Sequence, residues 1–166
     1  MASREKRIWE SINLVRRNQV LTQMLDEAAA ASLGINPIDG RAIDVIDQLR
    51  RITAGELARE LRLSTGAVTA LVDRLERAGY ARRVPDPEDR RRVLIEVTPV
   101  VHELSARIYG TPADAVAYAE SFTDEELETL YRYELLSKEW LEDRLKRIEG
   151  LPPRPRKLRM RGRGRA

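Results

Sequence analysis

Cysteine is absent from these 166 residues, and histidine occurs only once. The lack of cysteine excludes disulfide bonds, thiolate zinc sites and cysteine redox switches, and it suits a reducing cytoplasm, where we expect the protein to act. No stretch approaches the ~18 apolar residues that a membrane-spanning helix needs. The N-terminus, MASREKRIWE, is charged and helix-forming from its start, so we expect no secretory signal.

Motifs for catalysis and for metal or cofactor binding are also lacking. We find no pairing of a nucleophile with a base, no metal-ligand spacing and no phosphate-binding loop, so we expect no enzyme, no metal and no cofactor. His102 has no carboxylates at ligand spacing and is expected to be a packed or surface residue. The acidic run from Asp124 to Glu126 lies in the first turn of a predicted helix, where it complements the helix dipole.

Positive charge is concentrated at the C-terminus. Residues 151–166 carry seven Lys or Arg and no acid, so the 30 basic residues fall to 23 in the rest of the chain, against 27 acidic ones. The net charge of +3 therefore combines a body of about −4 with a strongly basic tail. Such a tail attracts polyanions, most often nucleic acid, although a disordered solubilising end explains it equally well.

Helical periodicity and capping residues divide the chain. A helix is predicted over residues 3–32, and a second begins at Asn36-Pro37 and is expected to bury Ile38, Ala42, Val45, Ile46 and Leu49. Residues 52–80 predict two short helices with a tight turn. Thr53 and Glu56 are expected to form a capping box for the first, whose apolar positions are Leu57, Ala58 and Leu61. Residues 81–97 predict a β-hairpin with a charged tip. A helix from Thr98-Pro99 is expected to be interrupted at Gly110 and Pro112, and a last one to start at Thr123.

The predicted fold is mainly α with a small β-hairpin wing: a winged helix-turn-helix dimerised through its N- and C-terminal helices. We divide it into residues 1–34 (dimerisation helix), 35–98 (DNA-binding domain), 99–150 (dimerisation helices) and 151–166 (disordered basic tail). The first and last helices have broad apolar faces that a small winged domain cannot cover alone. A two-fold homodimer built from residues 5–30 and 123–149 is therefore expected, with the helix after Thr98 contributing.

The helix over residues 64–78 has the two faces that recognition of a DNA major groove requires. Val68, Leu71, Val72 and Leu75 face inward, while small polar residues near the start, Ser64, Thr65, Gly66 and Thr69, face outward. An ordinary amphipathic helix in an α-helical core has the same pattern. The hairpin that follows favours DNA contact, because arginine suits the minor groove and its tip carries Arg90, Arg91 and Arg92. A solvated turn of mixed charge is the alternative, and Asp89 is placed to orient the Arg91 guanidinium.

In these helices and in the hairpin, the sequence resembles the MarR family of bacterial transcription regulators. The matching stretches are ITAGELARELRLSTGAVTALVDRLERAGY and DPEDRRRVLIEVTP, within which the Asp89/Arg91 pair and Asp73-Arg74-Leu75-Glu76 are the most specific. The resemblance implies a triangular homodimer with recognition helices in successive major grooves and wing arginines in the flanking minor grooves. It also implies, for many members, release from DNA by a small molecule. The absence of cysteine excludes the peroxide-sensing variant, and Gly110, Pro112 and the basic tail depart from the family pattern.

We therefore predict a sequence-specific regulator of double-stranded DNA, a repressor released by a small-molecule effector. The expected DNA contacts are Ser64, Thr65, Gly66, Thr69, Arg74, Arg83, Arg90, Arg91 and Arg92. An effector pocket is expected near Trp9, Asn13, Arg16 and His102, although surface polar residues beside a core tryptophan give the same pattern. The alternatives are a non-specific architectural nucleic-acid-binding protein that uses the arginine-rich tail, and an interaction module that has lost DNA binding.

Overall fold

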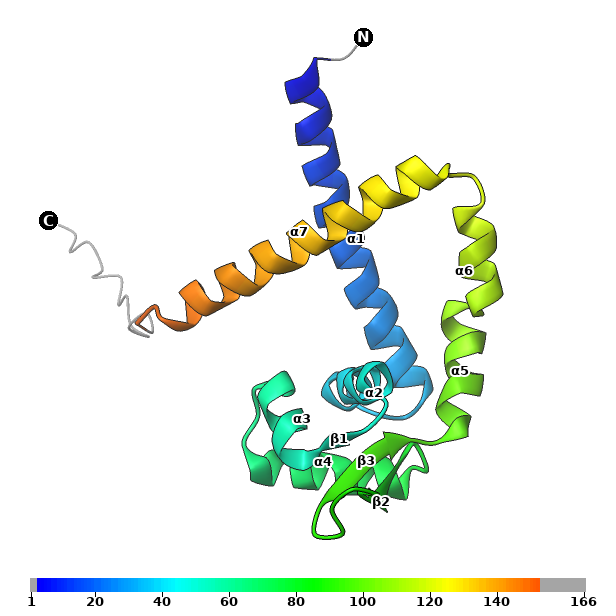
Figure 1. The fold of residues 1–166 in the computed structure, drawn as a ribbon, viewed down its shortest axis with the longest axis vertical. Helices are drawn as coiled ribbons and strands as arrows, with labels where there is room; N and C mark the ends of the chain where they lie inside the picture. The colour runs from blue at the N-terminus through cyan, green and yellow to red at the C-terminus, as the bar shows by residue number, and fades with distance from the viewer. Residues whose placement is uncertain (1–2, 153–166) are drawn as a thin grey trace, which may run out of the picture. The chain divides into compact units, whose positions relative to one another are not determined.

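The computed structural model describes residues 3–152, which form helices α1 to α7 and strands β1 to β3 (Figure 1). In chain order they are α1 (Arg4–Ser32), α2 (Pro37–Leu49), β1 (Ile52–Thr53), α3 (Ala54–Leu61), α4 (Thr65–Arg77), β2 (Ala81–Pro85), β3 (Val93–Val97), α5 (Pro99–Tyr109), α6 (Pro112–Ala119) and α7 (Asp124–Glu149). The chain divides into two compact units between Pro112 and Ala113. The predicted disorder of the tail concerns residues that, from 153 onward, lie outside the described part of the chain.

Helix starts follow the predicted capping residues. The side chain of Asn36 accepts from the Asp39 N–H, and Thr53 and Thr123 each form a complete capping box with the glutamate three residues later. Thr98 is the exception. It precedes α5, but its hydroxyl donates to the Gly79 carbonyl at 2.6 Å instead of accepting from the helix, so it ties the start of α5 to the end of α4.

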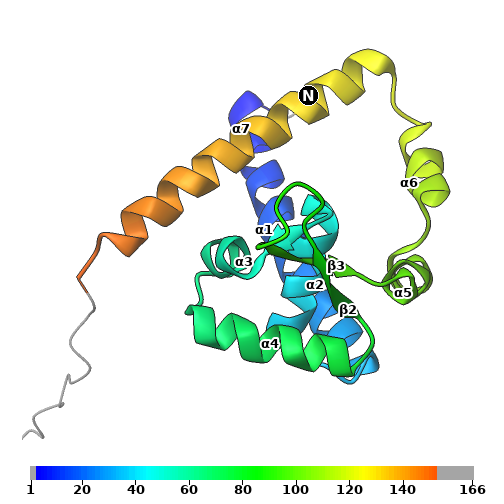
Figure 2. The same cartoon turned by 60° about the horizontal axis from the view of Figure 1, so that its bottom comes forward.

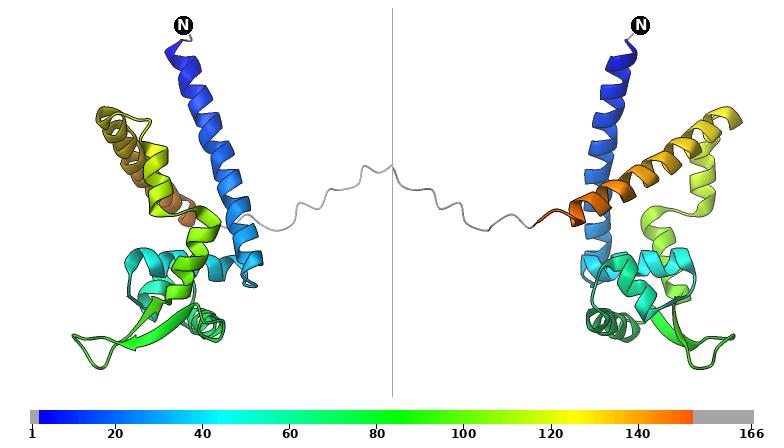
Figure 3. Two further views of the ribbon diagram at one scale, coloured as in Figure 1. Left: turned by 90° about the vertical axis from the view of Figure 1, so that its right-hand side faces the viewer. Right: turned by 60° about the vertical axis from the view of Figure 1, so that its left-hand side comes forward.

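The wing is part of a three-stranded antiparallel sheet in the order β1-β3-β2. The predicted hairpin is present as β2 and β3, which pair from Ala81 with Val97 to Pro85 with Val93. Strand β1 was not predicted. It pairs Ile52 with Ile95, and so joins the wing to the start of α3. The hairpin tip projects beyond the helices of the first unit (Figure 3).

The core of the first unit lies among α2, α3, α4 and the sheet (Figure 2). The predicted inward faces of α3 and α4 are confirmed, since all of these residues are buried: Leu57, Ala58, Leu61, Val68, Leu71, Val72 and Leu75. In α2 the prediction is correct for Ala42 and Ile46, which are fully buried, and Ile38 and Val45 are partly buried. It is wrong for Leu49, which is 51% exposed because it ends the helix, and it missed the buried Ile43.

Helix α1 touches the core only at its C-terminal end. Ala29 and Ala30 are its buried residues, and a Cβ on Gly40 of α2 would lie 3.6 Å from the Ala30 Cβ. Val15 is partly exposed, and eight further large apolar side chains of α1 are at least 40% exposed: Ile8, Trp9, Ile12, Leu14, Val20, Leu21, Met24 and Leu25. Most of this 29-residue helix thus carries exposed apolar side chains.

The predicted interruption after Thr98 is confirmed, because α5 ends at Tyr109 and α6 begins at Pro112. Gly110 between them has φ 88°, a left-handed conformation that favours glycine. In the second unit, α7 buries none of its residues. Its exposed apolar side chains are Leu127, Leu130, Tyr131, Tyr133, Leu135, Leu136, Trp140, Leu141, Leu145 and Ile148. None of the helices in residues 3–152 has the length and hydropathy to cross a membrane.

The junction between α2 and β1 contains a strained residue. Arg50 has φ 65° and ψ −51°, and the N–H of Arg51 donates to the carbonyl of Leu49 at 2.7 Å. This is a γ-turn of the hand that side-chain-bearing residues rarely adopt. The turn redirects the chain sharply, so that Arg51 and β1 reach the sheet directly after α2.

Candidate nucleic-acid interface

The first two turns of α4 carry an exposed surface of small polar residues. Ser64 caps the helix, its hydroxyl accepting from the Ala67 N–H at 3.3 Å. Thr65 and Gly66 are exposed, and a Cβ on Gly66 would meet no atom within 4 Å. The Thr69 hydroxyl donates to the Thr65 carbonyl at 3.0 Å, which leaves its oxygen free to accept a further bond. The structure thus brings all four predicted residues together at a helix N-terminus, a position that favours anions.

Arg74 fixes this helix to α2. Its Nε and terminal nitrogen donate to the two carboxylate oxygens of Asp39 at 2.9 and 2.6 Å, and a second terminal nitrogen donates to the Ala70 carbonyl. The Asp39 side chain is 3% exposed and also accepts from the Asn36 amide. The hydrogen bond with Asp39 raises the pKa of Arg74 further above its ordinary value. Arg74, predicted to contact DNA, is therefore engaged in holding α4 in place.

The wing tip presents two free guanidinium groups. Arg90 and Arg91 are exposed, and no ion pair within residues 3–152 involves either side chain. The carboxylate of Asp89 accepts from the backbone N–H of Arg91 at 2.9 Å, and its carbonyl accepts from the Arg92 N–H at 2.8 Å. Asp89 thus shapes the backbone of the turn, whereas the sequence had suggested that it orients the guanidinium.

Arg92 turns back toward the body of the wing. Its guanidinium lies 3.6 Å from the carboxylate of Asp86 and 3.9 Å from that of Glu56 at the start of α3. Asp86 is buried, and it also accepts from the Glu88 N–H at 2.9 Å. The hydroxyl of Thr53 is the main cause that lowers the pKa of Glu56, with Arg92 a smaller one. Asp86 and Glu56 thus have a structural role, since they hold the Arg92 guanidinium close to the body of the wing.

Glu96 at the centre of the sheet joins two further arginines. One carboxylate oxygen accepts from Arg51 Nε at 2.7 Å, and the other from Arg82 Nε at 2.8 Å. The hydrogen bond from Arg82 is the largest cause that lowers the pKa of Glu96, and Arg51 adds to it. Sequence reasoning missed this site. Hairpin register pairs residues 82 and 96 and offered a signal for one arginine, but nothing in the sequence relates Arg51 to Glu96.

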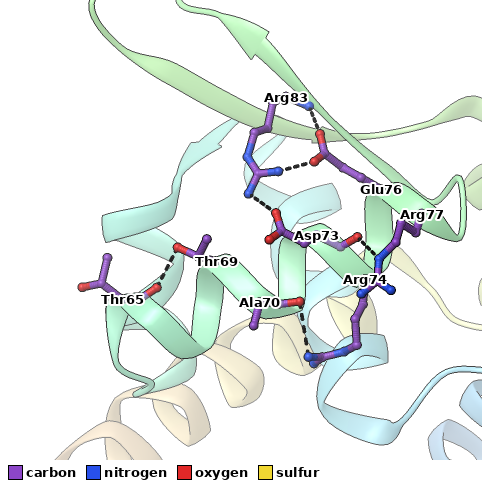
Figure 4. A network of polar contacts seen from close by, with 8 residues as sticks. All are labelled: Thr65, Thr69, Ala70, Asp73, Arg74, Glu76, Arg77 and Arg83. Atoms are coloured by element: carbon purple, nitrogen blue, oxygen red, sulfur yellow. Dashed lines mark hydrogen bonds and ion pairs between the residues drawn. The ribbon is translucent and has the colours of Figure 1, made fainter.

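Arg83 connects the wing to α4 (Figure 4). Its guanidinium contacts the carboxylate of Glu76 through one terminal nitrogen and donates to Asp73 at 2.8 Å through the other. Its backbone N–H donates to the second carboxylate oxygen of Glu76 at 2.9 Å. Asp73 in turn accepts through its carbonyl from Arg77. Arg83 was predicted to contact DNA, and the structure places it between two acids of α4.

The four residues of the predicted effector pocket do not come together within this chain. His102 on α5 lies 3.7 Å from the Asp47 carboxylate of α2, and further along α5 the Tyr109 hydroxyl donates to Asp26 of α1 at 3.1 Å. Burial and this contact raise the pKa of Tyr109 to about 12. Trp9 lies 17 residues before Asp26, or about 25 Å along the helix, and is therefore far from α5 and His102.

Among the described residues, no group of three His, Cys, Asp or Glu is arranged to hold a metal ion.

Comparison with known proteins points to one family. A model of the MarR family matches residues 33–92. The HTH-type transcriptional regulator YcgE of Bacillus subtilis, itself uncharacterised, is 36% identical over 140 residues, which cover 84% of this chain and 91% of YcgE. Streptococcus pneumoniae FabT, solved in complex with DNA, is 25% identical with a TM-score of 0.55, covering 84% of this chain and 98% of FabT. A MarR family protein from Bacillus stearothermophilus is 26% identical with a TM-score of 0.56, and the match covers 84% of this chain and 99% of that protein.

Proposed function

Because this chain belongs to the MarR family of winged helix-turn-helix transcription regulators, and is thus a DNA-binding regulator and not an enzyme, we propose that it represses transcription in the cytoplasm from a pseudo-palindromic operator. The proposal rests on one observation: α4 has an exposed polar surface at its start, and the wing tip has two exposed arginines that form no ion pair within residues 3–152. FabT, with the same fold, has been solved with DNA, which supports this assignment.

Sequence readout is assigned to the start of α4. Ser64, Thr65 and Thr69 present hydroxyls that bond base edges or phosphates, and Gly66 lets the backbone approach the groove closely. Arg90 and Arg91 enter the flanking minor groove, where negative potential is strongest when the groove is narrow. Arg74, Arg83 and Arg92 were also expected to contact DNA, and their bonds to Asp39, Glu76, Asp73 and Asp86 favour a role in positioning these elements.

A second copy of this chain is the proposed partner of the apolar surfaces on α1 and α7. The two long helices together expose about twenty large apolar side chains. Soluble monomers rarely expose so much contiguous apolar surface. A two-fold dimer built from residues 5–30 and 123–149 covers them and presents two α4 helices to half-sites about 10 bp apart. Sedimentation at micromolar concentration tests this, and a monomer there contradicts the proposal.

Release from DNA by a small molecule is the third part of the proposal, with the family as its support. The site we propose is near Trp9, Asn13, Arg16 and His102, and in view of the chain's geometry it needs residues from more than one protomer. A ligand that prefers the DNA-incompetent shape shifts the dimer away from its operator. The test is a ligand screen that follows both tryptophan fluorescence and DNA affinity, and a screen in which no compound changes both counts against it.

The alternative is an architectural protein that binds nucleic acid through its basic tail without reading sequence. Selection from a random duplex pool, followed by competition against unselected DNA, separates the two. Specific regulation requires a preference of at least ~10³-fold for the selected sequence. The tail, residues 151–166, adds sequence-blind attraction in our proposal. Its deletion should therefore weaken selected and random DNA by similar factors and flatten both salt dependences, since each neutralised phosphate adds about 0.9 to the slope.

A further inference from the structure

Arg83 directs its guanidinium and its backbone N–H to acids of α4, and so is not arranged as a residue that binds phosphate. Both terminal nitrogens of its guanidinium are used, one on Glu76 and one on Asp73, and its backbone N–H bonds to Glu76 as well (Figure 4). The side chain is 33% exposed, so it is neither buried in the core nor extended into solvent. These contacts join the two elements that the proposed function assigns to the major and minor grooves.

Strand β2 is an edge strand, and the contact with Glu76 replaces the missing neighbour. In the sheet order β1-β3-β2, no strand among residues 3–152 pairs with the outer side of β2, so its outward N–H groups need another acceptor. Glu76 supplies one to Arg83. The same carboxylate then binds the guanidinium, which makes one glutamate of α4 an anchor for both the backbone and the side chain of the wing strand.

The acids involved are costly for a protein that binds a polyanion. Asp73 is exposed on the recognition helix, and Glu76 lies one turn further along it. Uncompensated carboxylates at such positions repel phosphates. The presence of these acids on this face is explained if they hold Arg83 in place. The Arg83 guanidinium also neutralises part of their charge.

We propose that Asp73, Glu76 and Arg83 form a wing clamp, which fixes the direction of the wing relative to α4 so that helix and wing reach their grooves as one rigid unit. This inference rests on the proposed DNA-binding function. From Arg83 to the tip is about five residues of extended chain, or roughly 15 Å. A tilt of about 10° at the clamp moves Arg90 and Arg91 by about 2–3 Å, which is more than a groove contact tolerates. Arg83 is thus a positioning residue that acts through Arg91.

The sign of one substitution distinguishes the clamp from simple electrostatics. Glu76→Gln removes a negative charge close to DNA, so charge alone predicts tighter binding. The clamp predicts weaker binding to the selected operator, by roughly three- to thirtyfold. Glu88→Gln is the matched control, because it makes the same chemical change at an exposed wing residue outside the clamp, and it should leave affinity unchanged or raise it. A Glu76→Gln protein that binds as tightly as the wild type, or more tightly, overturns the clamp.

A double-mutant cycle with Arg91→Ala tests how the clamp acts. Glu76 and Arg91 are not in contact, so a merely structural role for Glu76 leaves their effects on DNA affinity independent. The clamp predicts that Arg91→Ala weakens operator binding by a smaller factor in the Glu76→Gln background than in the wild type, and equal factors overturn it. Thermal unfolding checks that each variant is folded. Asp73→Asn takes the place of Glu76→Gln should the latter fail to fold.

The same experiment separates failure of the clamp from failure of the function. A wild-type protein without preference for any selected duplex overturns the proposed function and the clamp with it. A wild type that selects an operator, together with a folded Glu76→Gln protein that binds it equally well, overturns the clamp alone.

Discussion

The contact between Arg74 and Asp39 predicts an asymmetry between the two partners. Arg74→Ala leaves the Asp39 carboxylate buried, with its side chain only 3% exposed and its main cationic partner gone. Asp39→Asn leaves a guanidinium that is already 40% exposed and can turn into water. Breaking a buried ion pair costs about 3–5 kcal/mol when the remaining charge stays buried. A lost hydrogen bond to a charged group whose partner rehydrates costs about 1–2 kcal/mol. We therefore expect Arg74→Ala to destabilise the protein more than Asp39→Asn does.

Urea unfolding followed by far-UV circular dichroism measures both free energies of unfolding. All proteins are compared at one concentration, because the stability of a dimer depends on it. Arg77→Ala is the matched control, since Arg77 is exposed on the same helix and, within residues 3–152, its guanidinium donates to the Asp73 carbonyl alone. It should change stability by no more than about 0.5 kcal/mol. The reasoning is refuted by an Arg74→Ala protein as stable as the Arg77→Ala control, or by an Asp39→Asn protein that is the less stable of the pair.

Three further predictions concern the wing, the sheet and the turn after α2. Arg91→Ala should weaken operator binding by ~1–3 kcal/mol and leave the thermal midpoint nearly unchanged, and unaltered affinity in a DNA titration contradicts the wing contact. The lowered pKa of Glu96 stabilises the fold above the ordinary glutamate pKa of about 4.3, and this stabilisation is lost as the pH falls through the lowered value. Urea unfolding between pH 6 and about 3 should therefore show a flatter pH dependence for Glu96→Gln than for the wild type. Arg50→Gly should raise the free energy of unfolding by about 1 kcal/mol, because glycine adopts the γ-turn without strain, and a less stable variant is evidence against it.

Local chemistry made the helices of this fold predictable from sequence. Caps such as Asn36, Thr53 and Thr123 act within three residues, and buried faces recur at helical spacing, so both are written in short stretches of chain. The interruption at Gly110 is local as well. Strand β1 escaped prediction because two residues carry no period, and its pairing with β3 depends on chain more than 40 residues away.

The candidate interface was predictable as a surface but not as a network. Thr65 and Thr69 stand out because a helix with one small polar face is visible in its own sequence. The partners of the arginines are not. Asp39 lies 35 residues from Arg74, and Glu96 lies 45 from Arg51, so only the folded chain separates arginines with partners from those without. The sequence treated Arg83, Arg91 and Arg92 alike, whereas the structure leaves Arg91 free of ion pairs within its described part.

The small contact at the base of α1 acts as the pivot of a long lever. Ala29, Ala30 and Gly40 form it, and from there α1 extends 26 residues, or about 39 Å, to Arg4. A rotation of 5° about this point displaces the far end by about 3 Å. In the proposed dimer the N-terminal ends of the two α1 helices are held together. The same rotation therefore changes the separation of the two α4 helices instead. In the proposed dimer, three residues with small side chains or none would thus govern how closely the separation of the two α4 helices matches the ~34 Å repeat of DNA.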